Sequence, residues 1–430
     1  MSLRLAPKGA VAENCLVESC TGGVRSVCGK IPISGKASSP DHQSSVRWHW
    51  PRLNALDGFD NMEEVVAVDS VVCAPALRGY MISQCEENVR LQEEAGPSLA
   101  RAFHPISREM QAAQERLAAI LTDTHSSVRE IIDFLLETPG KRIRPALVLL
   151  AAGAARGGSN GSFAAQHPSV EMAAAVEVIH MASLVHDDLI DDATVRHHRP
   201  SVHVRWNKRV AVKLGDYLCA KAFQLVAGCA DPRLFAILGP QLRTMCAGEI
   251  QQVVGRGGFG LGESDCLAMV EKKTAALFGA CCGAGAITAG SEPGICQALQ
   301  EFGRCFGIVF QLLDDCKDFL SDQEGLGKAP GQDLRAGDVT LPLLYATESG
   351  GRPRAGPRPR SRRPLGGRGL AGIREAFHSS AAPARTAKLI VSYLDQAKQA
   401  IRPLAGSDCK DCLLQLADNM AVSTSRVLAT

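Results

Sequence analysis

From about residue 98 onward, apolar residues recur at the three-to-four-residue spacing of an amphipathic helix, and almost no segment alternates as a strand does. Aromatic residues make up only 5% of the chain, whereas alanine and leucine are abundant, which favours helix over sheet. The 430 residues, 46% of them hydrophobic, are enough to bury a large core. We therefore predict an all-α protein.

Turn and cap residues delimit the expected helices. Pro139-Gly140 ends one apolar run, and Arg144-Pro145 opens the next, with proline in the first turn. The runs expected to be helical cover 112–122, 128–136, 146–155, 168–192, 210–227, 234–254, 267–289, 294–322, 340–347, 386–401 and 408–428.

Two segments lack this pattern. Residues 1–95 are rich in glycine, serine, proline and aspartate, so we predict a disordered or loosely attached extension before a folded domain over 96–430. Residues 351–370 hold seven arginines, five glycines and four prolines, which predicts a surface loop within that domain. The alternatives are a sequencing or frameshift artefact, or a basic tract that binds RNA or a membrane surface.

Charge and cysteine usage narrow the class of protein. The 47 Lys and Arg against 45 Asp and Glu give a net charge of +2, so we expect no nucleic-acid partner. No run reaches the roughly 18 uninterrupted apolar residues of a spanning helix, so we expect at most peripheral membrane contact. The 16 scattered cysteines and the absence of a recognisable signal peptide indicate a cytoplasmic location. Organelle targeting by the extension is the alternative.

Two aspartate clusters interrupt the apolar helices. The stretch DDLIDD at 187–192 and the stretch DDCKD at 314–318 both contain D-D-x-x-D. Residues four apart share a helix face, so Asp187 aligns with Asp191, and Asp314 aligns with Asp318. Carboxylates stacked in this way repel one another, and a cation must offset them.

A hard divalent ion with oxygen ligands fits such clusters, and Mg²⁺ commonly bridges one or two carboxylates to substrate phosphates. One motif alone is more often a solvated helix face. Two copies on apolar helices favour two groups of carboxylates, here called acidic rims, that face each other across a cavity and surround a diphosphate. The predicted metal ligands are Asp187, Asp188, Asp191, Asp314, Asp315 and Asp318.

Basic residues gather where further anions would bind. Three of them mark a loop-to-helix start, where backbone N–H groups and the helix dipole also attract phosphate. Separate acidic rims and cations imply two anionic substrates, one held through metal and one held directly. The cations are Lys141, Arg142, Arg144, Arg196, Lys272, Lys273 and Lys328.

Together these motifs resemble the trans-isoprenyl diphosphate synthase (polyprenyl synthetase) family, and most of all its bacterial long-chain, heptaprenyl-type members. The resemblance covers about residues 99–346. The matching stretches are GKRIRP at 140–145, EVIHMASLVHDDLIDDATVR at 177–196, AVKLGDYLCAKAF at 211–223, GEIQQ at 248–252, EKKTAALFG at 271–279 and the run from 306 to 346.

The resemblance implies a type I isoprenoid synthase helical bundle with a central cavity, usually a homodimer, and it leaves a small regulatory subunit open. It implies a prenyltransferase of isoprenoid biosynthesis that condenses isopentenyl diphosphate with an allylic diphosphate, using about three Mg²⁺ ions. Positive charge would stabilise the leaving diphosphate, and an apolar cavity would protect the carbocation from water.

The family's functional residues map onto matching positions here. Isopentenyl diphosphate would be held by Lys141, Arg144 and His180. The catalytic residues would be Asp187, Asp191, Lys273 and Asp314. The allylic diphosphate would contact Arg196, Lys273, Thr274, Gln311 and Lys328.

Two positions depart from the family's pattern. His197 stands where a second arginine usually helps to hold isopentenyl diphosphate. A histidine has an ordinary pKa of about 6.5, so it is charged mainly when the pH is below that value. We therefore expect weaker binding of that substrate, or reduced activity at high pH. Lys317 replaces an aliphatic residue inside the second motif, where it would bring a cation near the metal site.

Small residues precede the first motif where the family's short-chain members carry a bulky aromatic residue. Ala182 and Ser183 therefore favour a long product, unless Tyr217 or Phe223 on the next helix closes the tunnel. The alternatives are a farnesyl or geranylgeranyl diphosphate synthase, or a non-catalytic partner subunit of the same fold. The intact aspartates argue against a non-catalytic subunit.

Overall fold

The computed structural model describes residues 103–137, 140–157, 167–196, 199–255, 261–320, 331–349 and 367–429. Within these ranges the chain is helical apart from one two-stranded hairpin, which confirms the all-α prediction. The predicted extension over 1–95, His197, Lys328 and residues 351–366 of the arginine-rich tract lie outside the described residues.

The first half of the fold leads to the first aspartate motif and then away from it. Its elements are η1 (His104–Ile106), α3 (Ser107–Thr122), α4 (Ser126–Leu136), α5 (Ile143–Arg156), α6 (Pro168–Ile190), β1 (Val195–Arg196), β2 (Arg199–Pro200), α7 (Val202–Arg205), α8 (Lys208–Gly228) and α9 (Pro232–Gly255).

The second half carries the second motif. Its elements are α10 (Glu263–Val270), the π-helical segment η2 (Glu271–Ala275), α11 (Ala276–Thr288), α12 (Pro293–Leu320), α13 (Gln332–Ala336), α14 (Leu341–Ser349), α15 (Gly367–His378), α16 (Ala382–Ile401) and α17 (Asp408–Ala429).

Two expectations about these elements were wrong in detail. The single helix expected over 267–289 begins earlier, at Glu263, and is divided by the π-helical segment. Helix α15 begins at Gly367, inside the tract expected to be a loop. It forms there because Leu370, Ile373 and Phe377 recur at helical spacing and pack against the core.

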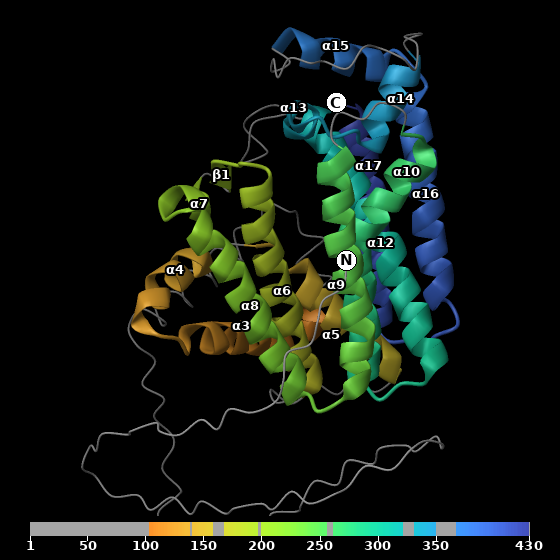
Figure 1. The fold of residues 1–430 in the computed structure, drawn as a ribbon. Coiled ribbons are helices and arrows are strands. Elements are labelled where there is room, and N and C mark those ends of the chain that lie inside the picture. The colour runs from red at the N-terminus through yellow and green to blue at the C-terminus, as the bar shows by residue number, and fades with distance from the viewer. Residues whose placement is uncertain are drawn as a thin grey trace, which may run out of the picture. The chain divides into compact units, whose positions relative to one another are not determined.

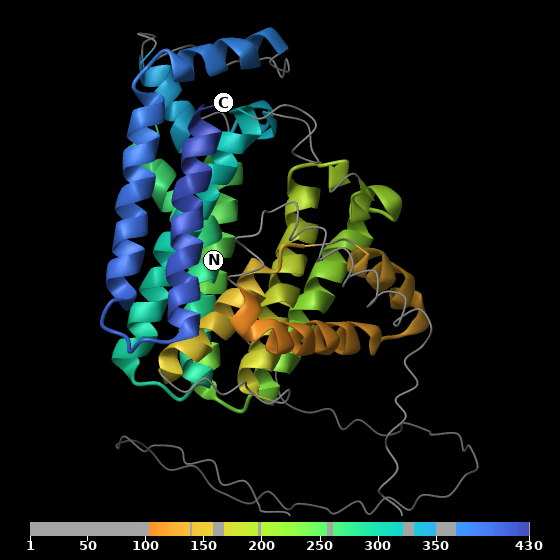
Figure 2. The ribbon, with the colours of Figure 1, turned by 180° about the vertical axis from the view of Figure 1, so that it is seen from behind.

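Helices α6 and α12 place the two motifs at the same end of the bundle. Helix α6 packs chiefly on α8, and α12 packs chiefly on α11 and α16. Both α6 and α12 run toward the end of the bundle where the hairpin and α13 lie (Figures 1 and 2). The carboxyl ends of the two helices therefore bring together aspartates that are far apart in the sequence.

Glycines let helix α11 approach its neighbours closely. A Cβ atom placed on Gly285 would lie 2.2 Å from the carbonyl oxygen of Val148 on α5. One placed on Gly303 of α12 would lie 2.4 Å from the carbonyl oxygen of Phe278. The absence of side chains at these points allows α5 and α12 to pack directly against α11.

Helix α6 forms the core of the layer that carries the first motif. Pro168 occupies its first turn, and the ring of His167 accepts a hydrogen bond from the Ser169 N–H at 3.1 Å. Among the described helices it is the one long and apolar enough to cross a membrane by length and composition alone. Most of it is buried inside the bundle, as expected of a core helix of a folded domain.

Candidate active site

The first aspartate motif straddles the end of α6. The helix ends at Ile190, two residues earlier than predicted, so that Asp191 caps it. The Asp191 N–H still donates to the carbonyl oxygen of Asp187 at 2.9 Å, which keeps the two aspartates one turn apart. Asp188 is buried, and Arg196 of the hairpin donates to its carboxylate at 2.7 Å. Asp188 therefore anchors the hairpin.

Asp187 carries charge that its surroundings only partly neutralise. Burial raises its pKa to about 7, and the negative charge of Glu249 on α9 adds to the effect. Lys273 and Arg196 act in the opposite direction but do not outweigh it. A further cation beside Asp187 would stabilise the charged form of its carboxylate.

The second motif divides its three aspartates in a similar way. Asp314 is exposed, and the Nζ atom of Lys317 lies 3.8 Å from its Oδ1 atom. Asp315 is buried, and the Gln311 amide donates to it at 2.7 Å. Burial raises the pKa of Asp315 well above its ordinary value. The carboxylate of Asp318 accepts the N–H of Asp333 at 3.1 Å and so supports the start of α13.

The π-helical segment presents Lys273 and Thr274. The Nζ atom of Lys273 lies 2.9 Å from Oε1 of Glu249 and donates to the amide oxygen of Gln252 at 3.0 Å. Burial lowers the pKa of this lysine, but Glu249 and the first-motif aspartates outweigh burial, so its pKa is raised. The Thr274 hydroxyl donates to Gln311 at 2.6 Å. This hydrogen bond connects the π-helical segment to the second motif.

The predicted phosphate site before α5 is built differently from expectation. Arg142 has a φ of 50° and caps the helix, and its guanidinium forms a buried ion pair with Glu177 of α6. Lys141 is exposed. Arg144 lies over the Phe278 ring, 4.7 Å from its centre, and its buried Nε atom has no hydrogen-bond partner among the described residues. Only Lys141 and Arg144 therefore remain as candidate phosphate ligands.

Arg144 connects the two motifs electrostatically. Burial lowers its pKa, and the charges of Glu177, Asp314 and Asp187 oppose this effect. Asp187 belongs to α6 and Asp314 to α12, so the charges of both motifs act on this half-buried arginine of α5. His180 lies on α6 seven residues before Asp187, which places the two on the same face of the helix.

The structure adds two residues that the sequence interpretation had not placed in the site. Glu249 and Gln252 of α9 bind Lys273. Both belong to the stretch GEIQQ, which was noted as a matching segment without a role. The signal available in the sequence was a charged and an amide side chain three residues apart on an otherwise largely apolar helix.

The donor set fits a metal that arrives with a phosphate ligand. Among the described residues, no group of three or more His, Cys, Asp and Glu side chains lies close enough to hold a metal alone. Mg²⁺ usually takes only one or two carboxylates and completes its shell with water and phosphate oxygens. The oxygen ligands of Asp187, Asp191 and Asp314, with the raised pKa of Asp187, suit such an ion.

A cavity of about 410 Å³ lies beside the second motif. It is bounded by α9, α10, the π-helical segment, α12 and the segment that leads into α14. The cavity therefore joins the lysine-bearing segment to the buried aspartate of the second motif. Its polar lining includes Gln252, Lys273, Gln311, Asp315 and Asp338.

A family model described as polyprenyl synthetase matches residues 125–355, which is more than half of the chain. The chain belongs to the polyprenyl synthetase family. It is therefore a prenyltransferase with the isoprenoid synthase helical-bundle fold, as the motifs had predicted.

Relatives in this family differ in product. The chain is 40% identical over 241 residues to heptaprenyl diphosphate synthase component 2 of Geobacillus stearothermophilus, covering 56% of this chain and 73% of the relative. It is 34% identical over 318 residues to a short chain isoprenyl diphosphate synthase of Methanothermobacter thermautotrophicus, covering 72% and 94%.

The fold is similar to that of a polyprenyl synthase from Caulobacter crescentus, whose crystal structure holds calcium and isoprenyl diphosphate. The TM-score is 0.66 and the sequence identity 32%, with 76% of this chain and 97% of that chain covered.

Proposed function

We propose that this chain is a Mg²⁺-dependent trans-polyprenyl diphosphate synthase that condenses isopentenyl diphosphate with an allylic diphosphate. The observation that carries the proposal is that α6 and α12 bring the two aspartate motifs to the same end of the bundle, where Lys273 pairs with Glu249 (Figures 1 and 2). Two acidic rims with cations nearby suit a pair of diphosphates, one bound through metal and one bound directly.

The residues divide between the two substrates. Asp187, Asp191 and Asp314 would hold Mg²⁺, which supplies positive charge to the departing diphosphate when bound. Lys273, Thr274 and Gln311 hold the allylic diphosphate, with Arg196 supporting the first motif through Asp188. Isopentenyl diphosphate lies against Lys141, Arg144 and His180.

The reaction requires positive charge beside the leaving diphosphate and a fixed position for the two substrates. Lys273 stays protonated beside Glu249 and stabilises the negative charge that develops as the allylic C–O bond breaks. The double bond of isopentenyl diphosphate then attacks the allylic carbocation and forms the new C–C bond. The proton lost afterwards passes to the released diphosphate, so no side chain has to act as the base.

We further propose a product longer than geranylgeranyl. Ala182 is buried and Ser183 is half-buried, so the side chains five and four positions before Asp187 are both small. Phe223 and Tyr217, the two residues that would close the tunnel in the alternative, each contact another residue. Phe223 is exposed and stacks on Phe235, and the Tyr217 hydroxyl donates to Thr124 at 2.7 Å.

A homodimer is part of the proposal. Helices α8 and α9 carry exposed apolar side chains, and the stacking of Phe223 on Phe235 joins the two helices into one surface. The relative named as component 2 of a heptaprenyl synthase makes a second, different subunit the alternative assembly.

The experiment is product analysis with the purified full-length chain. Labelled isopentenyl diphosphate, Mg²⁺ and either farnesyl or geranylgeranyl diphosphate are incubated with it, and the dephosphorylated products are sized. We expect products longer than geranylgeranyl, and none from Asp187→Asn or Asp314→Asn. Absence of turnover by the folded wild-type chain would contradict the proposal, whereas a farnesyl or geranylgeranyl product would contradict only the proposed length.

Ser183→Phe tests the length proposal directly. A phenylalanine on α6 below Asp187 is expected to block growth of the chain and to shorten the longest product. Ser183→Ala is the matched control, because it removes the hydroxyl without adding volume, and it should leave the product unchanged. An unchanged product in Ser183→Phe would show that the growing chain runs elsewhere.

A further inference from the structure

The π-helical segment Glu271–Ala275 carries Lys273 and Thr274, yet it is flanked by two cavities. The cavity of about 410 Å³ beside the second motif is lined by Lys272 and Lys273. A second cavity, of about 450 Å³, is lined by Glu271, Lys272 and Arg304. A π turn inside an α-helix is an uncommon local geometry that neighbouring structure has to maintain. Because a cavity lies on each side of the segment, contacts with neighbouring helices must hold it in place.

Helix α9 holds Lys272 and Lys273, and the remaining contacts come from one face of α12. The Thr274 hydroxyl donates to Gln311 at 2.6 Å. A Cβ atom placed on Gly307 would lie 2.8 Å from the Cα atom of Ala275, so the two backbones touch. The third contact comes from Arg304. Positions 304, 307 and 311 share a helix face, so a single stripe of α12 contacts both the first residue of the segment and its last two.

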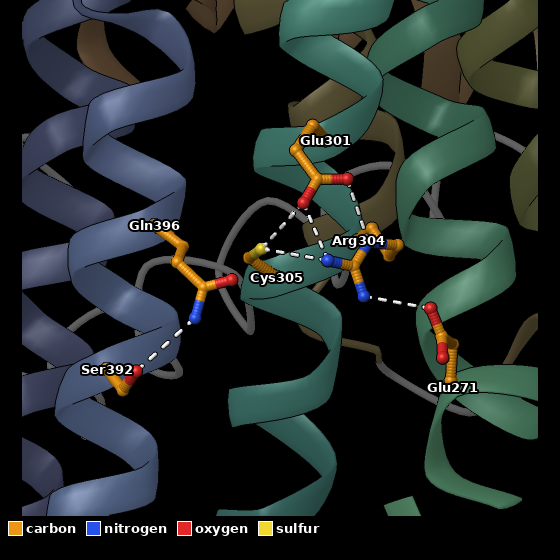
Figure 3. Close-up of polar contacts among 6 residues, drawn as sticks. All are labelled: Glu271, Glu301, Arg304, Cys305, Ser392 and Gln396. Atoms are coloured by element: carbon orange, nitrogen blue, oxygen red, sulfur yellow. Dashed lines mark hydrogen bonds and ion pairs between the residues drawn. The ribbon is translucent and has the colours of Figure 1, made fainter. Parts of the chain in front are cut away.

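Arg304 ties the first residue of the segment to α12 (Figure 3). Its Nε and Nη2 atoms donate to the carboxylate of Glu301 at 2.8 and 2.6 Å, and its Nη1 atom donates to Glu271 at 2.8 Å. The Cys305 thiol donates to the same Glu301 carboxylate at 3.4 Å. Two-point binding by Glu301 fixes the plane of the guanidinium, and its remaining edge holds Glu271.

The Arg304 side chain runs along the outside of the segment. Its backbone lies beside α11, where a Cβ atom placed on Gly279 would be 3.5 Å from the Arg304 nitrogen. Its guanidinium contacts Glu271, which lies eight positions before Gly279 in the chain. The side chain therefore reaches past the whole π-helical segment to the segment's first residue.

We propose that Arg304 is a positioning residue that, by holding Glu271, sets how Lys273 and Thr274 meet the allylic diphosphate. This inference rests on the proposed function of Lys273 and Thr274. Arg304 acts through the π-helical segment, and its contacts on the described chain are with Glu271, Glu301 and Cys305. The cluster of Glu271, Glu301, Arg304 and Cys305 thus links α12, which carries the second motif, to the segment that bears Lys273.

Steady-state kinetics of the full-length enzyme test the proposal. We expect Arg304→Met to raise KM for the allylic diphosphate about tenfold and to leave KM for isopentenyl diphosphate unchanged, because small misplacements of a binding group are costly. Glu271→Gln should shift the same constant in the same direction. Arg304→Lys, which keeps the charge but not the fork, should restore part of the affinity.

Arg116→Met is the matched control. Arg116 also forms a half-buried ion pair between two helices, 2.6 Å from Glu171, but it lies on α3, away from the π-helical segment. We expect it to lower stability without changing either KM. An equal rise of the allylic KM in Arg116→Met would overturn the proposal, because general loosening would then explain both variants.

Hydrogen exchange separates this inference from the proposed function. Backbone amides of residues 271–276 should exchange faster in Arg304→Met than in the wild-type chain or in Arg116→Met, whether or not the enzyme turns over. Unchanged exchange, or faster exchange with an unchanged allylic KM in an active enzyme, would overturn the positioning role. An inactive wild-type chain would instead contradict the proposed function.

Discussion

At the scale of single residues, neighbouring side chains decide what each aspartate of a motif does. Asp187 and Asp188 are adjacent, yet Asp188 is buried against Arg196 while Asp187 keeps a pKa of about 7. In the second motif, Gln311 binds Asp315 and the N–H of Asp333 binds Asp318. The D-D-x-x-D pattern predicted six metal ligands, and Asp188, Asp315 and Asp318 among them accept hydrogen bonds from donors within the protein.

The raised pKa of Asp187 predicts how stability depends on pH. The folded protein holds this proton more tightly than the unfolded chain, whose aspartates titrate near about 4, so the associated stability is present at low pH and lost as pH rises through 7. Without metal, the unfolding temperature of the wild-type protein should fall more between about pH 5 and about pH 8 than that of Asp187→Asn. Parallel declines in thermal unfolding would contradict this.

The ion pair between Arg142 and Glu177 predicts a large cost for a small change. Their side chains are only 9% and 5% exposed, so Glu177→Gln leaves an uncompensated charge in the core. We expect it to lower the free energy of unfolding by about 3 kcal/mol in urea titrations. Lys208→Met, which breaks an exposed pair with Asp192, should cost less than about 1 kcal/mol. Equal effects would show that burial does not distinguish the two pairs.

At the scale of elements, the absence of side chains governs how closely the helices pack. Helix α11 is buried along almost its whole length, and α5 and α12 lie against it at glycines. The periodic pattern predicted most of these helices to within a few residues. It did not predict the π-helical segment, because a π turn arises from packing and hydrogen bonds to α12 and not from local propensity.

Two glycine substitutions test this packing and should have opposite signs. In Gly285→Ala the new methyl group would meet the carbonyl oxygen of Val148, and we expect a loss of about 2 kcal/mol of unfolding free energy. Gly294 of α12 faces open space, so Gly294→Ala should stabilise by about 0.5 kcal/mol through a less flexible unfolded chain. Chemical denaturation of both variants gives the signs, and a stabilised Gly285→Ala would contradict the packing argument.

At the scale of the whole molecule, helices α8 and α9 expose an apolar surface that the described residues of one chain leave uncovered. Phe235, Ile250 and Val253 recur along one side of α9, and Phe223 of α8 stacks on Phe235. Isolated exposed apolar residues are ordinary, but several of them on two helices joined by an aromatic pair are typical of an interface.

This surface predicts a dimer that charge would disrupt. The double variant Phe235→Asp with Ile250→Asp should sediment as a monomer under conditions in which the wild-type chain sediments as a dimer, because two buried carboxylates at an interface are costly. Val391→Asp, on α16, alters an exposed apolar residue outside this surface and should leave the dimer intact. A monomeric wild-type chain, or a variant that stays dimeric, would contradict the assignment.

The sequence by itself determined the helical class, most helix positions, the family and the residue types of the site. These follow from local periodicity and from motifs whose spacing puts aspartates on one face of a helix. Only the tertiary structure decided which acids are already engaged, that Arg142 pairs with Glu177, and that Glu249 and Gln252 hold Lys273. The reason is physical: burial and partners from distant helices set the charge and orientation of a side chain, and neither is encoded in its immediate neighbours.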